Sequence, residues 1–63
     1  MYQLLVYHPG DKRPSADVRV TRAADVLDRI PELLSEHHGC EHIVVTFNDV
    51  RLFAVDCAGN RLP

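Results

Sequence analysis

The side chains best suited to chemistry gather in one short segment, His37-His38-Gly39-Cys40-Glu41-His42, and a second cysteine follows at Cys57. Imidazole nitrogen and thiolate sulfur are the ligands that zinc prefers, and alternation along strands would put Cys40, His42 and Cys57 on one sheet face. Zinc motifs usually have a close pair of ligands at both ends, however, whereas Cys57 stands alone. For this reason a homodimeric zinc-binding domain is only an alternative prediction. Its ligands would be His38, Cys40, His42 and Cys57, with His37 nearby.

The simpler interpretation gives the same residues structural roles. His37 and His38 fall at the end of a predicted helix, where the helix dipole favours cations, and the cysteines fill strand ends as small apolar residues. If the chain turns in two residues at Asn48-Asp49, Phe47 pairs with Val50 and the two cysteines fall directly opposite each other. A disulfide is then geometrically possible, although a reducing compartment would keep both thiols free.

No arrangement typical of an enzyme accompanies these residues. Cys40 follows a predicted helix C-terminus, where the dipole opposes the thiolate that a nucleophile needs. Ser15 and Ser35 have no neighbouring base, and the glycines are isolated, so a catalytic triad and a phosphate-binding loop are both missing. We predict a protein that is not an enzyme and that needs no cofactor.

A second pattern lies on the polar side of the helix expected at residues 21–38. Carboxylates recur there at spacings of three, four and four residues, about one per helical turn of 5.4 Å, at Asp25, Asp28, Glu32 and Glu36. In charge and coarse spacing this row resembles the phosphates of a nucleic-acid strand, so it could dock into the basic groove of a nucleic-acid-binding protein. Arg22 and Arg29 can pair with Asp25 and Glu32 and soften the field. The simpler interpretation is an ordinary solvated helix face.

A third pattern is a set of basic residues around the first loop, namely Lys12, Arg13, Arg19 and Arg22. Such residues contact phosphates, which makes a weak nucleic-acid-binding module a second alternative. Asp11 and Asp17 cancel much of this charge, and no aromatic residue is interleaved to stack on bases. Direct nucleic-acid binding is therefore disfavoured.

Length and composition bound the remaining possibilities. With 63 residues the chain has room for one core, so we predict a single domain over residues 1–63. A net charge of −2 does not favour a general polyanion binder. The longest apolar run, Leu4 to Tyr7, is far too short to cross a membrane, and no secretory signal is recognisable, so we expect a cytoplasmic protein.

Periodicity and turn residues then predict the elements that position these side chains. Apolar residues at helical spacing, with Thr21 as the N-cap and Gly39 past the C-terminus, predict one helix that continues through a kink at Pro31. Its apolar arc consists of Ala23, Val26, Leu27, Ile30, Leu33 and Leu34. Strands are expected at residues 2–8, 17–20, 42–47 and 51–57, with residues 61–63 as a tail that pairs briefly with an edge.

The predicted fold is α+β, with one amphipathic helix packed on a mostly antiparallel sheet of three or four strands, in the order ββαββ or, without the strand at residues 17–20, βαββ. Alternation puts Ile43, Val45, Phe47, Leu52 and Ala54 on one face of the last hairpin, and Val44, Phe53, Val55 and Cys57 on the other. One helix covers one face only. We therefore expect a second copy or another protein to cover the other, most simply in a homodimer formed through the sheet.

These observations favour a small, non-enzymatic, protein-binding module that acts stoichiometrically. The main hypothesis is an inhibitor whose acidic helix face, at Asp25, Asp28, Glu32 and Glu36, engages a basic site on a larger nucleic-acid-binding protein. Inhibitors that phages and plasmids direct against defence systems are an analogous biological context.

Overall fold

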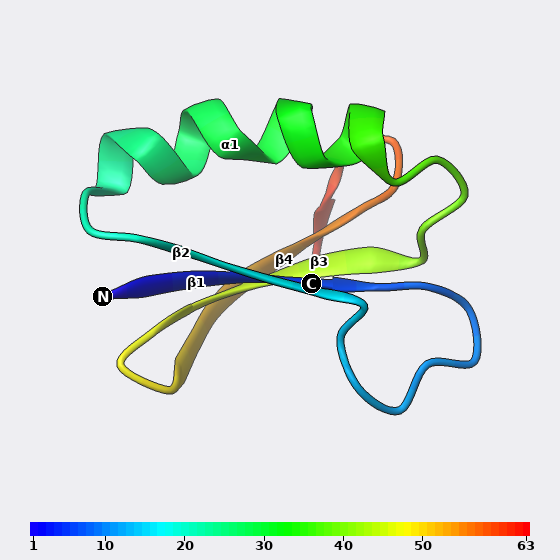
Figure 1. Cartoon of the computed structure of the whole chain (residues 1–63), viewed down its shortest axis with the longest axis horizontal. Helices are drawn as coiled ribbons and strands as arrows, with labels where there is room; N and C mark the ends of the chain where they lie inside the picture. Colours follow the sequence, from blue (N-terminus) through cyan, green and yellow to red (C-terminus); the bar gives the residue numbers. More distant parts are fainter.

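The computed structural model describes all residues, 1–63, and has one helix packed on an open, five-stranded antiparallel sheet (Figure 1). The α+β class and the helix-on-sheet arrangement are as predicted. The elements are β1 (Tyr2–Tyr7), β2 (Ala16–Val20), α1 (Ala23–Glu36), β3 (His42–Phe47), β4 (Val50–Asp56) and β5 (Arg61–Leu62). The helix is too short and too polar to cross a bilayer.

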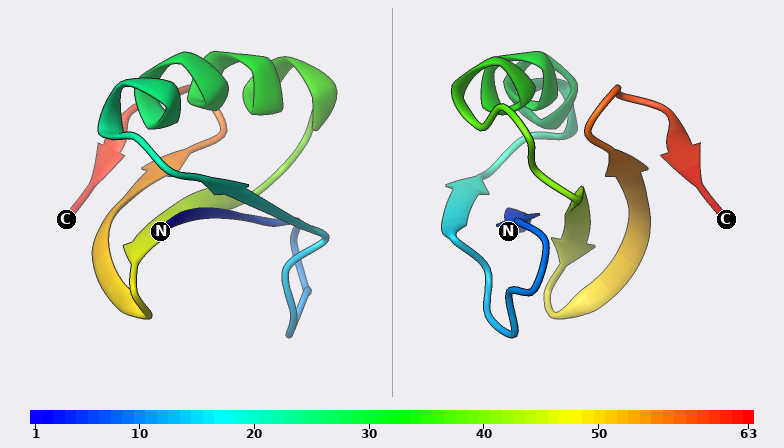
Figure 2. Two further views of the ribbon diagram at one scale, coloured as in Figure 1. Left: turned by 60° about the vertical axis from the view of Figure 1, so that its left-hand side comes forward. Right: turned by 90° about the vertical axis from the view of Figure 1, so that its right-hand side faces the viewer.

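The sheet has the strand order β2-β1-β3-β4-β5, and all neighbouring strands are antiparallel. The short strand predicted at residues 17–20 exists and lies at an edge, as expected. The strand count is one higher than predicted because the C-terminal tail pairs with β4. The Asp56 carboxylate holds this last turn by accepting hydrogen bonds from the backbone N–H groups of Ala58 and Asn60. Figure 2 shows the sheet curling beneath the helix, with β2 at one edge and β5 at the other.

The helix is continuous through Pro31, as predicted, but it is shorter than residues 21–38 at both ends. The prediction of Thr21 as the N-cap is wrong, because Arg22 occupies that position in an extended conformation and no side chain caps the helix. At the other end His37 is the C-cap, and its N–H donates to the Leu33 carbonyl. Gly39 has the expected positive φ of 79°. It lies two residues after the C-cap His37, whereas the sequence predicted it directly after the C-cap.

The core lies between the two central strands and the inner side of the helix. Leu4, Val6, Ile43 and Val45 are completely buried, and Val26 and Leu33 cover them from α1. The helix packs against β1 and β2. The apolar arc was predicted to bury Leu27, but its exposed fraction is 68%. Because the helix sits over the β2 half of the sheet, Leu27 faces the open side above β4 instead.

The β3–β4 hairpin turns in two residues, one of the alternatives that the sequence left open, and Phe47 pairs with Val50. Asn48 and Asp49 have φ values of 49° and 67°. Positive φ at both central residues is the pattern of a type I′ turn, whose twist matches that of the flanking strands.

A β-bulge in this hairpin overturns the predicted faces of β4. The register shifts between Val45 and Thr46, where Leu52 is left as the extra residue of β4. A shift of one residue moves every later side chain to the other face of the sheet. The helix side of the hairpin therefore consists of Ile43, Val45, Phe53, Val55 and Cys57, while Val44 and Ala54 lie on the outer side.

Candidate functional site

The predicted acidic row lies along the exposed side of α1, because the helical spacing of its members turns them away from the core. Two arginines neutralise part of it. Arg22 Nε lies 3.2 Å from Asp25 Oδ2. Arg29 Nη1 lies 3.1 Å from Glu36 Oε2 and 3.8 Å from Glu32 Oε1. The hydrogen bonds that the Arg22 guanidinium donates to the Asp25 carboxylate raise the pKa of Arg22.

Asp28 is the one carboxylate of the row that makes no ion pair or side-chain hydrogen bond. Two guanidinium groups against four carboxylates leave the row with a net negative charge centred on Asp28 and Glu32. Ion pairs at this exposure contribute little to stability, since solvent screens them. Their main effect is to hold Asp25 and Glu36 in place along the helix.

The alternative zinc site is not assembled. Cys40 and Cys57 are adjacent, but His42 lies on the outer face of the sheet, stacked on Tyr7 with ring centroids 4.9 Å apart. The bulge and the chain bend before β3 separate it from the cysteines. His38 is exposed in the turn after the helix. No three His, Cys, Asp or Glu side chains converge on a point where a metal ion could bind.

The two cysteines meet at one end of the core, where the chain enters β3 and leaves β4. Their Sγ atoms are 2.6 Å apart and both are free thiols. Cys40 is buried, with an exposed fraction of 6%, whereas Cys57 is partly exposed. Burial, together with the hydrogen bond to Cys57, raises the pKa of the Cys40 thiol to about 11. Nearby, His8 Nε2 approaches His37 Nδ1 to 3.4 Å, a contact that links β1 to the helix C-cap.

The predicted basic set does not form one patch. Lys12 and Arg13 lie in the β1–β2 loop at one end of β2, while Arg22 lies at the other end, next to the helix (Figure 1). Five strand residues at about 3.3 Å each separate the two ends. Arg22 is paired with Asp25, and Arg19 lies 3.8 Å from Asp17. The charges needed for phosphate contacts are therefore dispersed.

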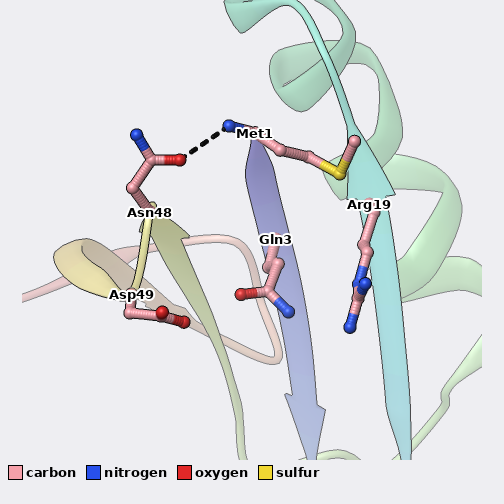
Figure 3. A pocket seen from close by; sticks show the side chains of 5 residues that line it. All are labelled: Met1, Gln3, Arg19, Asn48 and Asp49. Carbon is pink, nitrogen blue, oxygen red and sulfur yellow. Dashed lines mark hydrogen bonds between the residues drawn. The ribbon is translucent and has the colours of Figure 1, made fainter.

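Arg19 instead borders a polar hollow of about 300 Å³ on the outer sheet face (Figure 3). The hollow is lined by Met1, Gln3, Arg19, Asn48 and Asp49. The Met1 ammonium donates a hydrogen bond of 2.9 Å to Asn48 Oδ1. The nearby charges have both signs, so the hollow lacks the uniformly basic surface that favours phosphates.

An apolar groove of about 250 Å³, which the sequence did not indicate, lies on the helix side of the sheet. It opens between the first half of α1 and the β3–β4 hairpin, and all its lining residues are apolar: Tyr2, Ala23, Val26, Leu27, Val45, Leu52 and Phe53. Leu27 and Leu52 are 68% and 47% exposed at its rim. The acidic row lies on the opposite flank of the helix, since Asp25 and Leu27 are about 160° apart around its axis.

The outer face of the sheet is more polar than predicted, because the bulge turns Phe53, Val55 and Cys57 toward the helix. Polar side chains from Gln3, Asp17, Arg19, His42 and Thr46 lie on this outer face among half-buried apolar ones. This face therefore offers a second copy less apolar surface than expected, and the homodimer through the sheet stays a prediction.

Comparisons of the chain with protein-family models, with curated proteins and with solved structures found no match.

Proposed function

We propose that this chain is a small, non-enzymatic, protein-binding module whose acidic helix face engages a basic surface of a larger partner. The observation that carries the proposal is the row formed by Asp25, Asp28, Glu32 and Glu36 on the exposed side of α1. Its members stand on one rigid element, so their spacing is set by the helix before binding. A partner that presents lysines or arginines at matching intervals gains several charge-assisted contacts.

The partner class follows from the charge pattern. Carboxylates at steps of one helical turn compete for the sites that bind phosphates in a nucleic-acid-binding protein. Asp28 carries most of the interaction, because its carboxylate is free of arginine. Electrostatic complementarity of this kind mainly increases the association rate and the specificity of a complex.

The apolar groove supports a protein-binding role independently of charge. Exposed apolar surface next to a formed groove is typical of protein–protein contacts. The groove and the acidic row lie on different flanks of α1, so variants can separate their contributions.

The test begins with crosslinking to the immobilised chain, which identifies a partner by mass spectrometry. The affinity of the purified partner is then measured for the wild type and for the double variant Asp28→Lys/Glu32→Lys. We expect the reversal to weaken binding at least tenfold, about 1.4 kcal/mol. We also expect added salt to weaken wild-type binding, and a duplex DNA oligonucleotide to compete with it.

A matched control carries the same change of charge elsewhere, in Asp17→Lys/Glu41→Lys, and should keep its affinity within about twofold of the wild type. Circular dichroism verifies the fold of each variant. Unchanged affinity in the Asp28/Glu32 variant would refute the acidic-face proposal. So would a loss confined to Leu27→Ser/Leu52→Ser, which would place the contact in the apolar groove.

A further inference from the structure

The only two cysteines of the chain lie in contact although 17 positions separate them in sequence. Their Sγ atoms are 2.6 Å apart, well within the distance of about 4 Å at which heavy atoms count as touching. Cys40 sits in the connection between α1 and β3, and Cys57 directly follows β4. Apart from this contact with each other, the thiols make one weak hydrogen bond, which Cys57 donates to the His37 carbonyl at 3.8 Å.

We propose that Cys40 and Cys57 form a reversible intramolecular disulfide, and that the pair is an oxidation site of the folded protein. A disulfide bond is about 2.05 Å long, so the two sulfur atoms have about 0.5 Å left to close. No carboxylate of the acidic row contacts either thiol, and the proposal is independent of the proposed function.

The chemistry is a thiol–disulfide exchange with a small disulfide such as oxidised glutathione. Cys57 reacts first because it is the more exposed thiol. Its thiolate attacks one glutathione sulfur, the glutathione S–S bond breaks, one glutathione leaves as thiolate, and a mixed disulfide remains on Cys57. The Cys40 sulfur, after losing its proton to solvent, then attacks Cys57 Sγ and displaces the second glutathione. The protein dithiol is oxidised by two electrons, and one oxidised glutathione is reduced to two thiols.

The structural consequence is a covalent ring around the β3–β4 hairpin. Closing a loop of this length removes conformational freedom from the unfolded chain. For a domain this small, the oxidised form should melt about 10–20 °C above the reduced form. The bond also ties the exit of α1 to the turn that carries β5, because the Cys40 N–H already donates to the His37 carbonyl at 3.2 Å.

The experiment equilibrates the full chain in glutathione redox buffers, traps thiols with N-ethylmaleimide and measures intact masses. We expect a monomer lighter by two hydrogen atoms that carries no label. Trypsin cuts after Arg29, Arg51 and Arg61, so the bond should link the peptide of residues 30–51 to that of residues 52–61. The equilibrium constant for the disulfide should be about a hundredfold larger in native than in guanidinium-denatured protein.

Equal constants for native and denatured protein would overturn the proposal, as would oxidation that yields only disulfide-linked dimers or glutathione adducts. These measurements use the wild type alone and do not depend on a variant that folds. Cys57→Ala and Cys40→Ala serve as controls, and in each the difference in melting temperature between oxidising and reducing buffer should vanish. A difference that persists in either variant contradicts the assignment.

Discussion

Two leucines on the same helix provide the sharpest test of how α1 sits on the sheet. Leu33 has an exposed fraction of 1% and Leu27 of 68%. Replacing a buried leucine by alanine costs about 3–5 kcal/mol, because transferred apolar area is lost and a cavity remains. Full burial of a leucine contributes about 1.5–3 kcal/mol, so one that is only a third buried should lose about 0.5–1 kcal/mol. Leu33→Ala should therefore be several times more destabilising than Leu27→Ala.

Urea denaturation monitored by circular dichroism measures both free energies of unfolding, and the shared Leu→Ala change cancels the difference in helix propensity. A domain of 63 residues has a total stability of about 3–9 kcal/mol, so Leu33→Ala removes at least about a third of it and, at the lower end of the range, all of it. Trimethylamine N-oxide, which strengthens effective burial, keeps the comparison measurable if that variant unfolds in buffer. Equal losses, or a larger loss for Leu27→Ala, would mean that the helix is rotated about its axis, with Leu27 against the sheet.

Three further outcomes are expected. Pro31→Ala should raise the free energy of unfolding by about 1–3 kcal/mol, because it restores an N–H donor for the Leu27 carbonyl at an exposed position; an unchanged urea midpoint would contradict this. Asp49→Gly should raise the free energy of unfolding by a few tenths to about 1 kcal/mol, because φ at this position is 67° and glycine adopts positive φ without strain. A lower melting temperature would count against the type I′ turn. For the reduced protein, the free energy of unfolding should fall as pH rises from about 9 toward 11. The reason is that the unfolded state loses the Cys40 proton near its ordinary pKa of 9.0, whereas the folded pKa is about 11; a flat profile over this range would refute the burial of that thiol.

Much of the fold was predictable because it depends on local patterns. Period-2 alternation over residues 17–20 located the edge strand, helical periodicity located α1, and the polar connection at residues 48–50 indicated the hairpin. The ends of α1 were less predictable, since the hydroxyl of Thr21 makes no capping contact and the chain begins its helix only after Arg22. Cap residues indicate where a helix can begin, while packing of the first turn decides where it does.

The faces of β4 could not be predicted, because one inserted residue inverts them. Strict alternation from the pair Phe47–Val50, which a two-residue turn sets, leads to Leu52 opposite Val45, whereas the bulge puts Phe53 there. Bulges follow from sheet twist and from packing on both faces, for which a single strand sequence has no distinct signal. The same inversion explains why the outer sheet face is more polar than expected, and hence why the argument for a homodimer weakened.

The candidate surfaces divide according to how many elements build them. The acidic row belongs to one helix, so its spacing follows from sequence once the helix is placed, and an error of one or two residues at the helix ends leaves it intact. The apolar groove depends on the rotation of α1 and on the bulge together, because Leu27 must face outward and Leu52 must be displaced from the strand pairing.

The predictability of the cysteine contact is intermediate between that of the acidic row and that of the groove. The expected register of this contact was wrong by one residue, yet the two sulfur atoms meet because Cys40 precedes β3 and is not held to the strand alternation. Contacts made just outside regular strands tolerate an error of register that contacts within them do not. The Cys40–Cys57 contact, which the sequence offered on the condition of a two-residue turn, therefore forms despite the bulge.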